Sequence, residues 1–541
     1  MSSCFRRPRS EICLKGTRLV FVAALTALAS CPAWTQSSAK TPELGTVSFP
    51  TSCDPAVQAD FERAVAMLHS FWFAQAGRTF RSVLERDPEC AIATWGIATN
   101  LIGNALGGNS NPEDAKRARE VLERGRAIGP KTERERFYIE AVAEYWDRVG
   151  DRPQLARMKS LARAFGILAE RFPEDDEAQI FHALYLTATQ SPADKSFGPA
   201  LQAAAILEIQ FKKHPDHPGV AHYLIHSYDY PPIAERGLAA ARRYADIAPS
   251  APHALHMPSH IFTRVGAWEE SAATNLRGAA VAKAENSPGD RLHAMDYMVY
   301  AYLQLARDRD ADRVVEEARG IKGFSPGQFG IAYALAAMPA RAAVERGKWE
   351  DAAKLKPRAS RFPQTEAITH FARALGAARG GDADAAGREA QELARIAKTL
   401  RDAKNPYWAT EVDVQRRGAA AWAAYARGER GQGLSLMRSA ADREDRSEKS
   451  AVTPGRLVPA RELLGDMLLE SGKPAEALAE YERSQLHDPR RYRGLYGAAR
   501  AAAQSGDRDK ARYYYTRLLG LAGSESARPE LGAARDYLGR N

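Results

Sequence analysis

The stretch LGDMLLESGKPAEALAEYERSQLHDP, residues 464–489, decides the fold class. Gly465 is small enough to let two helices approach each other, and Tyr481 can fill the space that remains between them. The Ser471-Gly472 turn permits a tight reversal of the chain, and Pro489 ends the second helix. The stretch therefore predicts one pair of antiparallel helices.

The same pattern returns at an interval of 34 residues, which is the length of one tetratricopeptide (TPR) unit. The turn Ser471-Gly472 recurs as Ser505-Gly506, and the turn glycines Gly347 and Gly381 have the same spacing. Strand signals are scarce, because few β-branched alternations occur and alanine dominates many segments. We therefore expect an all-α protein, a TPR-type α-solenoid built as a right-handed superhelix of antiparallel helix pairs.

The length of 541 residues exceeds the size at which a single hydrophobic core usually keeps growing. We expect the mixed-charge run 442–449 to be a solvated linker. The predicted segments are an export signal at 1–33, a disordered linker at 34–52, an N-terminal TPR array with a histidine-rich groove at 53–320, middle helical repeats at 321–445, and a C-terminal TPR pair at 446–541.

The N-terminus has the pattern of an export signal, because basic residues precede the apolar run Leu19–Ala29, which is too short to span a bilayer comfortably. Cleavage near Cys31 would release the protein into the periplasm or to the surface of a bacterium. The alternative is a lipoprotein, because Leu28-Ala29-Ser30-Cys31 resembles a lipobox in which Cys31 would carry a lipid anchor. We favour cleavage, and expect no membrane span in the rest of the chain.

The formal net charge of +9 is poor support for nucleic-acid binding. The leader contributes +4 (five basic residues and one acidic), which leaves +5 for the rest of the chain. Elsewhere the two signs are mixed, without a long basic block. We expect no nucleic-acid partner.

Cys53 and Cys90 are the cysteines that follow the leader. In an oxidising compartment they are candidates for one disulfide, and the alternative is a pair of buried thiols.

Two histidine pairs repeat at the TPR interval: His222 and His226 recur as His256 and His260. A spacing of four residues puts two imidazoles on one face of a helix, and a neighbouring helix can supply further ligands. Neutral imidazoles suit zinc or another first-row divalent ion. These four histidines are a candidate metal site. The alternative is that they cap helices and fill the interior of an irregular repeat pair.

The repeat register also places polar residues of the first helices on the concave ligand face. Asp229 is the best candidate for a general base, if the site is catalytic. Pro258 either bends its helix or starts it late, and a late start would place His256 out of register with His222. The candidate groove residues are His222, His226, Asp229, His253, His256, His260, His293, Asp296 and Tyr300.

Four segments resemble a group of exported bacterial TPR proteins without assigned function: LHSFWF at 68–73, DPECA at 87–91, AHYLIHSYD at 221–229 and APHALHMPSHIF at 251–262. The likeness spans nearly the whole mature chain and implies the fold and export, but no reaction. In that group a pair like Glu448-Lys449 is often followed by His-Pro. This chain has Ser450-Ala451, so any histidine role at that position is absent.

From the sequence we expect an exported binding or scaffolding protein. It would hold a protein segment or a small ligand in its concave groove, with or without a histidine-bound divalent metal. The competing class is a metal-dependent enzyme, either a hydrolase or a redox protein. No HExxH, nucleophile elbow, P-loop or dinucleotide fingerprint supports a particular reaction, so the sequence favours a protein that is not an enzyme.

Overall fold

The computed structural model describes residues 41–107, 112–324, 327–523 and 526–540. Within these ranges the chain is helical with connecting loops and has no β-strand, which confirms the predicted all-α class. None of the described helices is both long and apolar enough to cross a bilayer. The predicted export signal at 1–33 and the candidate lipid anchor Cys31 lie outside the described residues.

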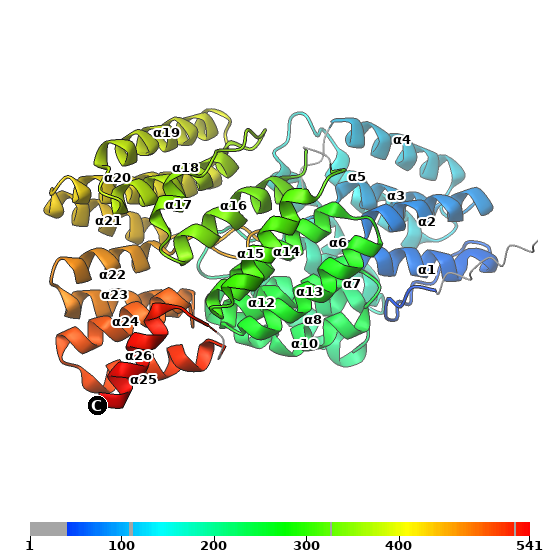
Figure 1. Cartoon of the computed structure of the whole chain (residues 1–541). Helices are drawn as coiled ribbons and strands as arrows, with labels where there is room; N and C mark the ends of the chain where they lie inside the picture. Colours follow the sequence, from blue (N-terminus) through cyan, green and yellow to red (C-terminus); the bar gives the residue numbers. More distant parts are fainter. Residues whose placement is uncertain (1–40, 108–111, 325–326, 524–525, 541) are drawn as a thin grey trace, which may run out of the picture. The chain divides into compact units, whose positions relative to one another are not determined.

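The helices follow one another along the chain and are joined by loops of different lengths (Figure 1). The first half of the chain contains α1 Pro55–His69, α2 Phe73–Arg86, α3 Ile92–Ile102, α4 Pro112–Ile128, α5 Glu133–Trp146, α6 Gln154–Arg171, α7 Asp176–Thr187, α8 Gly198–Lys213, α9 Pro218–Tyr228, the 3₁₀ helix η1 Pro231–Gly237, α10 Leu238–Ile247, α11 Pro252–His256, α12 Pro258–Val265 and α13 Trp268–Ala284. The second half contains α14 Pro288–Gln304, α15 Asp308–Gly320, α16 Phe329–Glu345, α17 Trp349–Ala353, α18 Pro363–Arg379, α19 Ala383–Asp402, α20 Pro406–Ala426, α21 Arg430–Glu444, α22 Ala460–Glu470, α23 Pro474–His487, α24 Tyr492–Ser505, α25 Arg508–Leu521 and α26 Pro529–Arg540.

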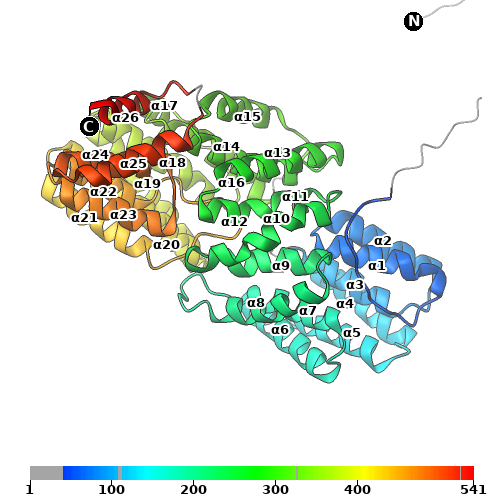
Figure 2. The ribbon, with the colours of Figure 1, turned by 90° about the horizontal axis from the view of Figure 1, so that it is seen from below.

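Successive helices pack as pairs, and the pairs stack on one another (Figures 1 and 2). Within pairs, α1 packs on α2, α7 on α8, α18 on α19 and α24 on α25. Between pairs, first helices pack on the next first helix, as α14 does on α16, α16 on α18, α18 on α20 and α22 on α24. This is the arrangement of a TPR-type α-solenoid.

Small residues fit against aromatic rings where neighbouring pairs meet. A Cβ at Gly497 would lie 2.3 Å from Cζ of Tyr481, and one at Gly96 would lie 2.4 Å from Cε1 of Phe80. In both contacts the glycine follows the aromatic residue at the same distance along the sequence. The same packing of a glycine against an aromatic ring therefore occurs near both ends of the solenoid. The turn residue Gly472 has φ of 72°, a conformation that glycine adopts without a steric penalty.

The buried apolar side chains form two clusters that meet near residue 265. One cluster spans residues 44–262 and the other spans 268–534, while the backbone of 42–541 forms one compact unit. The segment boundaries expected at residues 320 and 445 fall inside the second cluster. Helix α14 packs on α16 across the first of these boundaries, and α21 packs on α22 across the second.

The segment expected to be a disordered linker, 34–52, is anchored within residues 42–52 by two buried side chains. Phe49 is fully buried with its ring centroid 5.2 Å from that of Phe61, and Leu44 is also buried. The apolar side chains in this segment explain the difference, because they complete the core beside α1. A disulfide joins Cys53, next to the start of α1, to Cys90, in the loop after α2.

The loop 445–459 between α21 and α22 is held inside the protein (the orange loop in Figure 2). The charged run 442–449 was expected to be a solvated linker, but Glu448 and Lys449 at its end are buried. Arg341 on α16 donates to two backbone carbonyls of the loop, one of them at 2.7 Å. The expectation was wrong for this end of the run, because ion pairs with distant helices offset the cost of burying its charges.

Candidate metal centre

Six histidines from four helices come together where the two hydrophobic clusters meet. The first triad is His222 and His226 on α9 with His253 on α11. The second triad is His256 on α11, His260 on α12 and His293 on α14. Within each triad, one ligand nitrogen of every ring lies within 4.8 Å of the other two.

The four histidines that were expected to form one site belong to two different triads, and a helix break at Pro258 lies within the second of them. Helix α11 ends at His256 and α12 begins at Pro258, which cannot donate a backbone hydrogen bond. His253 joins the histidines of α9, while His256, from the same short helix as His253, and His260 share a triad with His293 of α14. The structure therefore replaces the predicted set of four with two sets of three, and adds His253 and His293 as candidate ligands.

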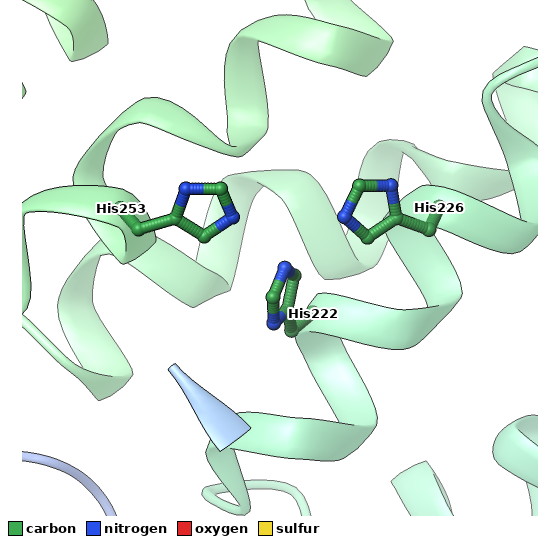
Figure 3. A group of neighbouring side chains, drawn as sticks. All are labelled: His222, His226 and His253. Carbon is green, nitrogen blue, oxygen red and sulfur yellow. The ribbon is translucent and has the colours of Figure 1, made fainter. Parts of the chain in front are cut away.

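In the first triad, the three rings converge (Figure 3). The Nε2 atoms of His222, His226 and His253 are buried and have no hydrogen-bond partner among the described residues. Nδ1 of His222 lies 2.6 Å from the carbonyl oxygen of His69. A carbonyl can only accept, so the ring hydrogen is on Nδ1 and Nε2 carries a free lone pair.

In the second triad, two lone pairs face each other. Asn275 donates through Nδ2 to the carbonyl of Ser271, so its Oδ1 accepts from Nδ1 of His256 at 2.7 Å. Nδ1 of His260 donates to the carboxylate of Asp229 at 3.0 Å. The neutral rings of His256 and His260 therefore present lone pairs on their Nε2 atoms, which are only 3.1 Å apart. A cation bound by both nitrogens would remove this repulsion.

Tyr297 on α14 contacts the second triad. Its hydroxyl lies 3.3 Å from Nε2 of His260 and 3.1 Å from the carbonyl oxygen of Thr453. The hydroxyl has one proton for these two acceptors, so it can satisfy one of them at a time.

Burial keeps the six imidazoles in the neutral form that binds metals. It lowers the pKa of His222 and of His293 to about 3. Burial, reinforced by the neighbouring imidazoles, also lowers the pKa values of His226, His253 and His256 well below the ordinary value.

A buried charged group supports the second triad. Both carboxylate oxygens of Asp229 are engaged, one by Nε of Arg264 at 2.8 Å and the other by Nζ of Lys449 at 3.0 Å and by His260. Burial alone would raise the pKa of Asp229, but Lys449 and Arg264 hold it well below the ordinary value. Burial lowers the pKa of Lys449 to about 8. In this arrangement Asp229, expected to be a general base, orients His260.

A third cluster, His69, Glu177 and His217, has a different character. Glu177 accepts from Nε2 of His69 and from Nε2 of His217, each at 2.8 Å. Nδ1 of His69 lies 2.9 Å from the Tyr223 hydroxyl, and Nδ1 of His217 accepts from the Val220 backbone. All four ring nitrogens have partners, so this cluster is explained by its own hydrogen bonds.

A cavity of about 630 Å³ reaches the first triad at His226. Asp229 and Lys449 also line it, together with aromatic side chains that include Tyr407 and Trp408. The volume lies in the usual range for a small-ligand pocket.

The predicted groove residues do not line an open groove where they are buried. His222 is 0% exposed, and His256 and His260 are 2% exposed. On α14, the Tyr300 hydroxyl accepts from Arg491, away from both triads. Oδ1 of Asp296 has no hydrogen-bond partner within the described part of the chain, and burial raises the pKa of Asp296 to about 7.

Sequence reasoning missed Asn275, Arg264 and Lys449. Lys449 is 220 residues from its partner Asp229, and no local pattern marks such a contact. Asn275 lies in the middle of α13, where its spacing from His256 matches no ligand motif.

No protein-family model matches the chain, and no curated protein matches it. Among solved structures, yeast Tom70 is similar with 12% identity over 90% of this chain and 96% of that chain, at a TM-score of 0.30. Naa15/Naa10 bound to HypK-THB is similar with 12% identity over 90% and 79%, at a TM-score of 0.21. Both neighbours are TPR-repeat proteins.

Proposed function

We propose that this chain is a TPR-type helical protein that holds transition-metal ions at the first and second triads. The observation that carries the proposal is the convergence of three buried Nε2 atoms without partners in the first triad. An unsatisfied buried polar atom costs roughly 1–3 kcal/mol. Three such atoms around one point are costly unless an ion binds them.

The donor set supports a first-row transition metal. Each triad offers three neutral imidazoles, a set that zinc and copper accept and that leaves a coordination position open. The Nδ1 partners are a backbone carbonyl, the Asn275 amide and the Asp229 carboxylate. Metal-binding histidines almost always have such outer partners, because these fix the tautomer.

The cavity beside His226 supports a small molecule as the ligand that reaches the metal. α-Solenoids present extended binding surfaces, and this supports the expected role of a binding scaffold. The second candidate function is a metal-dependent enzyme, either a hydrolase or a redox protein. It is favoured by a three-ligand triad that opens to a cavity.

Export to a bacterial periplasm or cell surface is part of the proposal. The disulfide between Cys53 and Cys90 supports an oxidising compartment, and the leader pattern supports secretion. Separation of periplasmic and cytoplasmic fractions tests this directly. Recovery of the protein in the cytoplasm alone would contradict it.

Elemental analysis tests metal binding, with untagged protein purified from its native compartment. We expect about one ion per triad in the wild type and loss of most of the metal in the double variant His222→Ala, His256→Ala. His370→Ala is the control, because His370 pairs with Glu389 outside both triads and should keep the wild-type content. Wild-type protein without metal would overturn the proposal.

A further inference from the structure

The two triads lie side by side. The ring centroids of His226 and His260 are 5.5 Å apart, and those of His253 and His256 are 5.9 Å apart. Both pairs join the first triad to the second. Ions held by the two triads would therefore be near neighbours, as in two-metal sites, where the ions are about 3.5–4 Å apart.

The chemistry of the donors narrows the choice of metal. The six candidate ligands are all imidazoles, and neither triad includes a carboxylate or a thiolate. The carboxylate that contacts the second triad, Asp229, is already neutralised by Arg264 and Lys449. The cysteines Cys53 and Cys90 are joined in a disulfide. Nothing anionic in the donor set offsets the charge of bound ions.

This lack of anionic ligands favours ions of low charge. Two divalent ions would add four positive charges to a buried site, whereas two Cu(I) ions would add two. Uncompensated buried charge is expensive, so the site favours the monovalent pair. Copper is also among the metals that imidazole ligands suit.

We propose that the six histidines hold a pair of copper ions and that dioxygen binds between them as a bridging ligand. This inference rests on the proposed metal binding and adds the metal and the ligand. If Cu(I) occupied both triads, the two ions would supply the two electrons that reduce dioxygen to peroxide, one electron from each ion. No proton or further reductant is needed, and the total charge of the site stays the same.

Reconstitution of the full chain with Cu(I) under anaerobic conditions, followed by exposure to oxygen, tests the inference. We expect about two copper ions per chain and uptake of about one dioxygen per copper pair. After oxidation, the unpaired electrons of two bridged Cu(II) ions couple, so the electron paramagnetic resonance signal should be nearly absent.

The double variant His222→Gln, His253→Gln disrupts the first triad alone. We expect it to bind about half the copper, to take up no dioxygen by the paired route, and after chemical oxidation to show the full signal of an isolated Cu(II) ion. His293→Gln disrupts the second triad alone, with the same expected results. Because His293 is partly exposed, this variant provides the test if the first variant does not fold. The control His370→Gln should behave as wild type, because His370 pairs with Glu389 away from the triads.

The outcomes separate this inference from the proposed function. Wild-type protein that binds no metal overturns both. Two Cu ions with the full signal of isolated Cu(II) and no oxygen uptake leave metal binding standing and overturn the bridged pair. A single copper ion per chain, or zinc alone in protein from the native compartment, overturns the copper pair in the same way.

Discussion

At the scale of single residues, the partner of each Nδ1 atom decides which ring nitrogen can bind a metal. The His69 carbonyl, Asn275 and Asp229 each accept from Nδ1 of a different histidine. Each therefore directs the Nε2 lone pair of that histidine toward its triad.

Replacement of Asn275 by alanine removes the acceptor for Nδ1 of His256. The ring is then free to change its tautomer or to turn. Loss of such an outer partner typically weakens metal binding 10–100-fold, and we expect roughly that loss at the second triad. Competition with a chromophoric chelator measures it.

Asn405→Ala is the matched control, since Asn405 caps the start of α20. It should cost about 1 kcal/mol of stability and leave metal affinity unchanged. Equal weakening of metal binding in the two variants would show that general destabilisation, and not the lost acceptor, is the cause.

Glu177 between His69 and His217 makes stability depend on pH. Burial alone would raise the pKa of Glu177, but the two imidazoles hold it well below its ordinary value. The ordinary value of about 4.3 applies to the unfolded chain. The stabilisation is therefore fully present above that pH and is lost as the pH falls below it.

We expect Glu177→Gln to lower the free energy of unfolding more at about pH 7 than at about pH 3. Urea unfolding at the two pH values measures the difference. An equal loss at both values would contradict the argument, since it would show that charge at Glu177 contributes nothing.

At the scale of elements, the site depends on a broken helix and a buried loop. The period of 34 residues indicated that His256 and His260 would occupy the positions of His222 and His226. In the structure His253 and His256 lie on the same short helix α11 but belong to different triads, so it is His253 that joins the histidines of α9. Each predicted pair stays together within one triad, and a third histidine that the period did not mark completes each set.

Arg341 on α16 anchors the loop 445–459. Replacement of Arg341 by methionine removes this donor from two backbone carbonyls of the loop. The Gly455 carbonyl keeps the Tyr333 hydroxyl, whereas the Arg456 carbonyl loses its donor at a cost of roughly 1–3 kcal/mol. We expect faster amide hydrogen exchange in the loop, measured by mass spectrometry.

The control for this variant is Arg346→Met on the same helix end, because Arg346 bonds to Ala342 and Asp312 and not to the loop. Exchange in the loop should stay at the wild-type rate. If Arg341→Met also leaves loop exchange unchanged, the loop is held by its other contacts.

At the scale of the whole molecule, the histidines join the two hydrophobic clusters. Met257 and Ile261, beside the histidines of α11 and α12, belong to the first cluster. Leu292 and Met295, beside His293 on α14, belong to the second. Ions bound across these helices would hold the two parts of the core together.

Removal of metal should therefore lower thermal stability. Free metal at 100 times its Kd stabilises the folded state by about 2.7 kcal/mol per site. We expect a chelator to lower the Tm of the wild type and to leave the Tm of His222→Gln, His256→Gln much less changed. Differential scanning calorimetry measures both, and equal shifts would contradict binding at the triads.

The sequence by itself determined the repeat class. Small residues, turn glycines and prolines recur at a fixed interval, and each acts on the packing of helices that are close along the chain. It also indicated four of the six histidines that come together, since their spacing follows the same interval. Their division into two triads was decided by tertiary structure, since the third member of each triad comes from a neighbouring helix. The roles of Asn275 and Lys449 were decided there too, because they depend on contacts between segments whose distance along the chain carries no periodic signal.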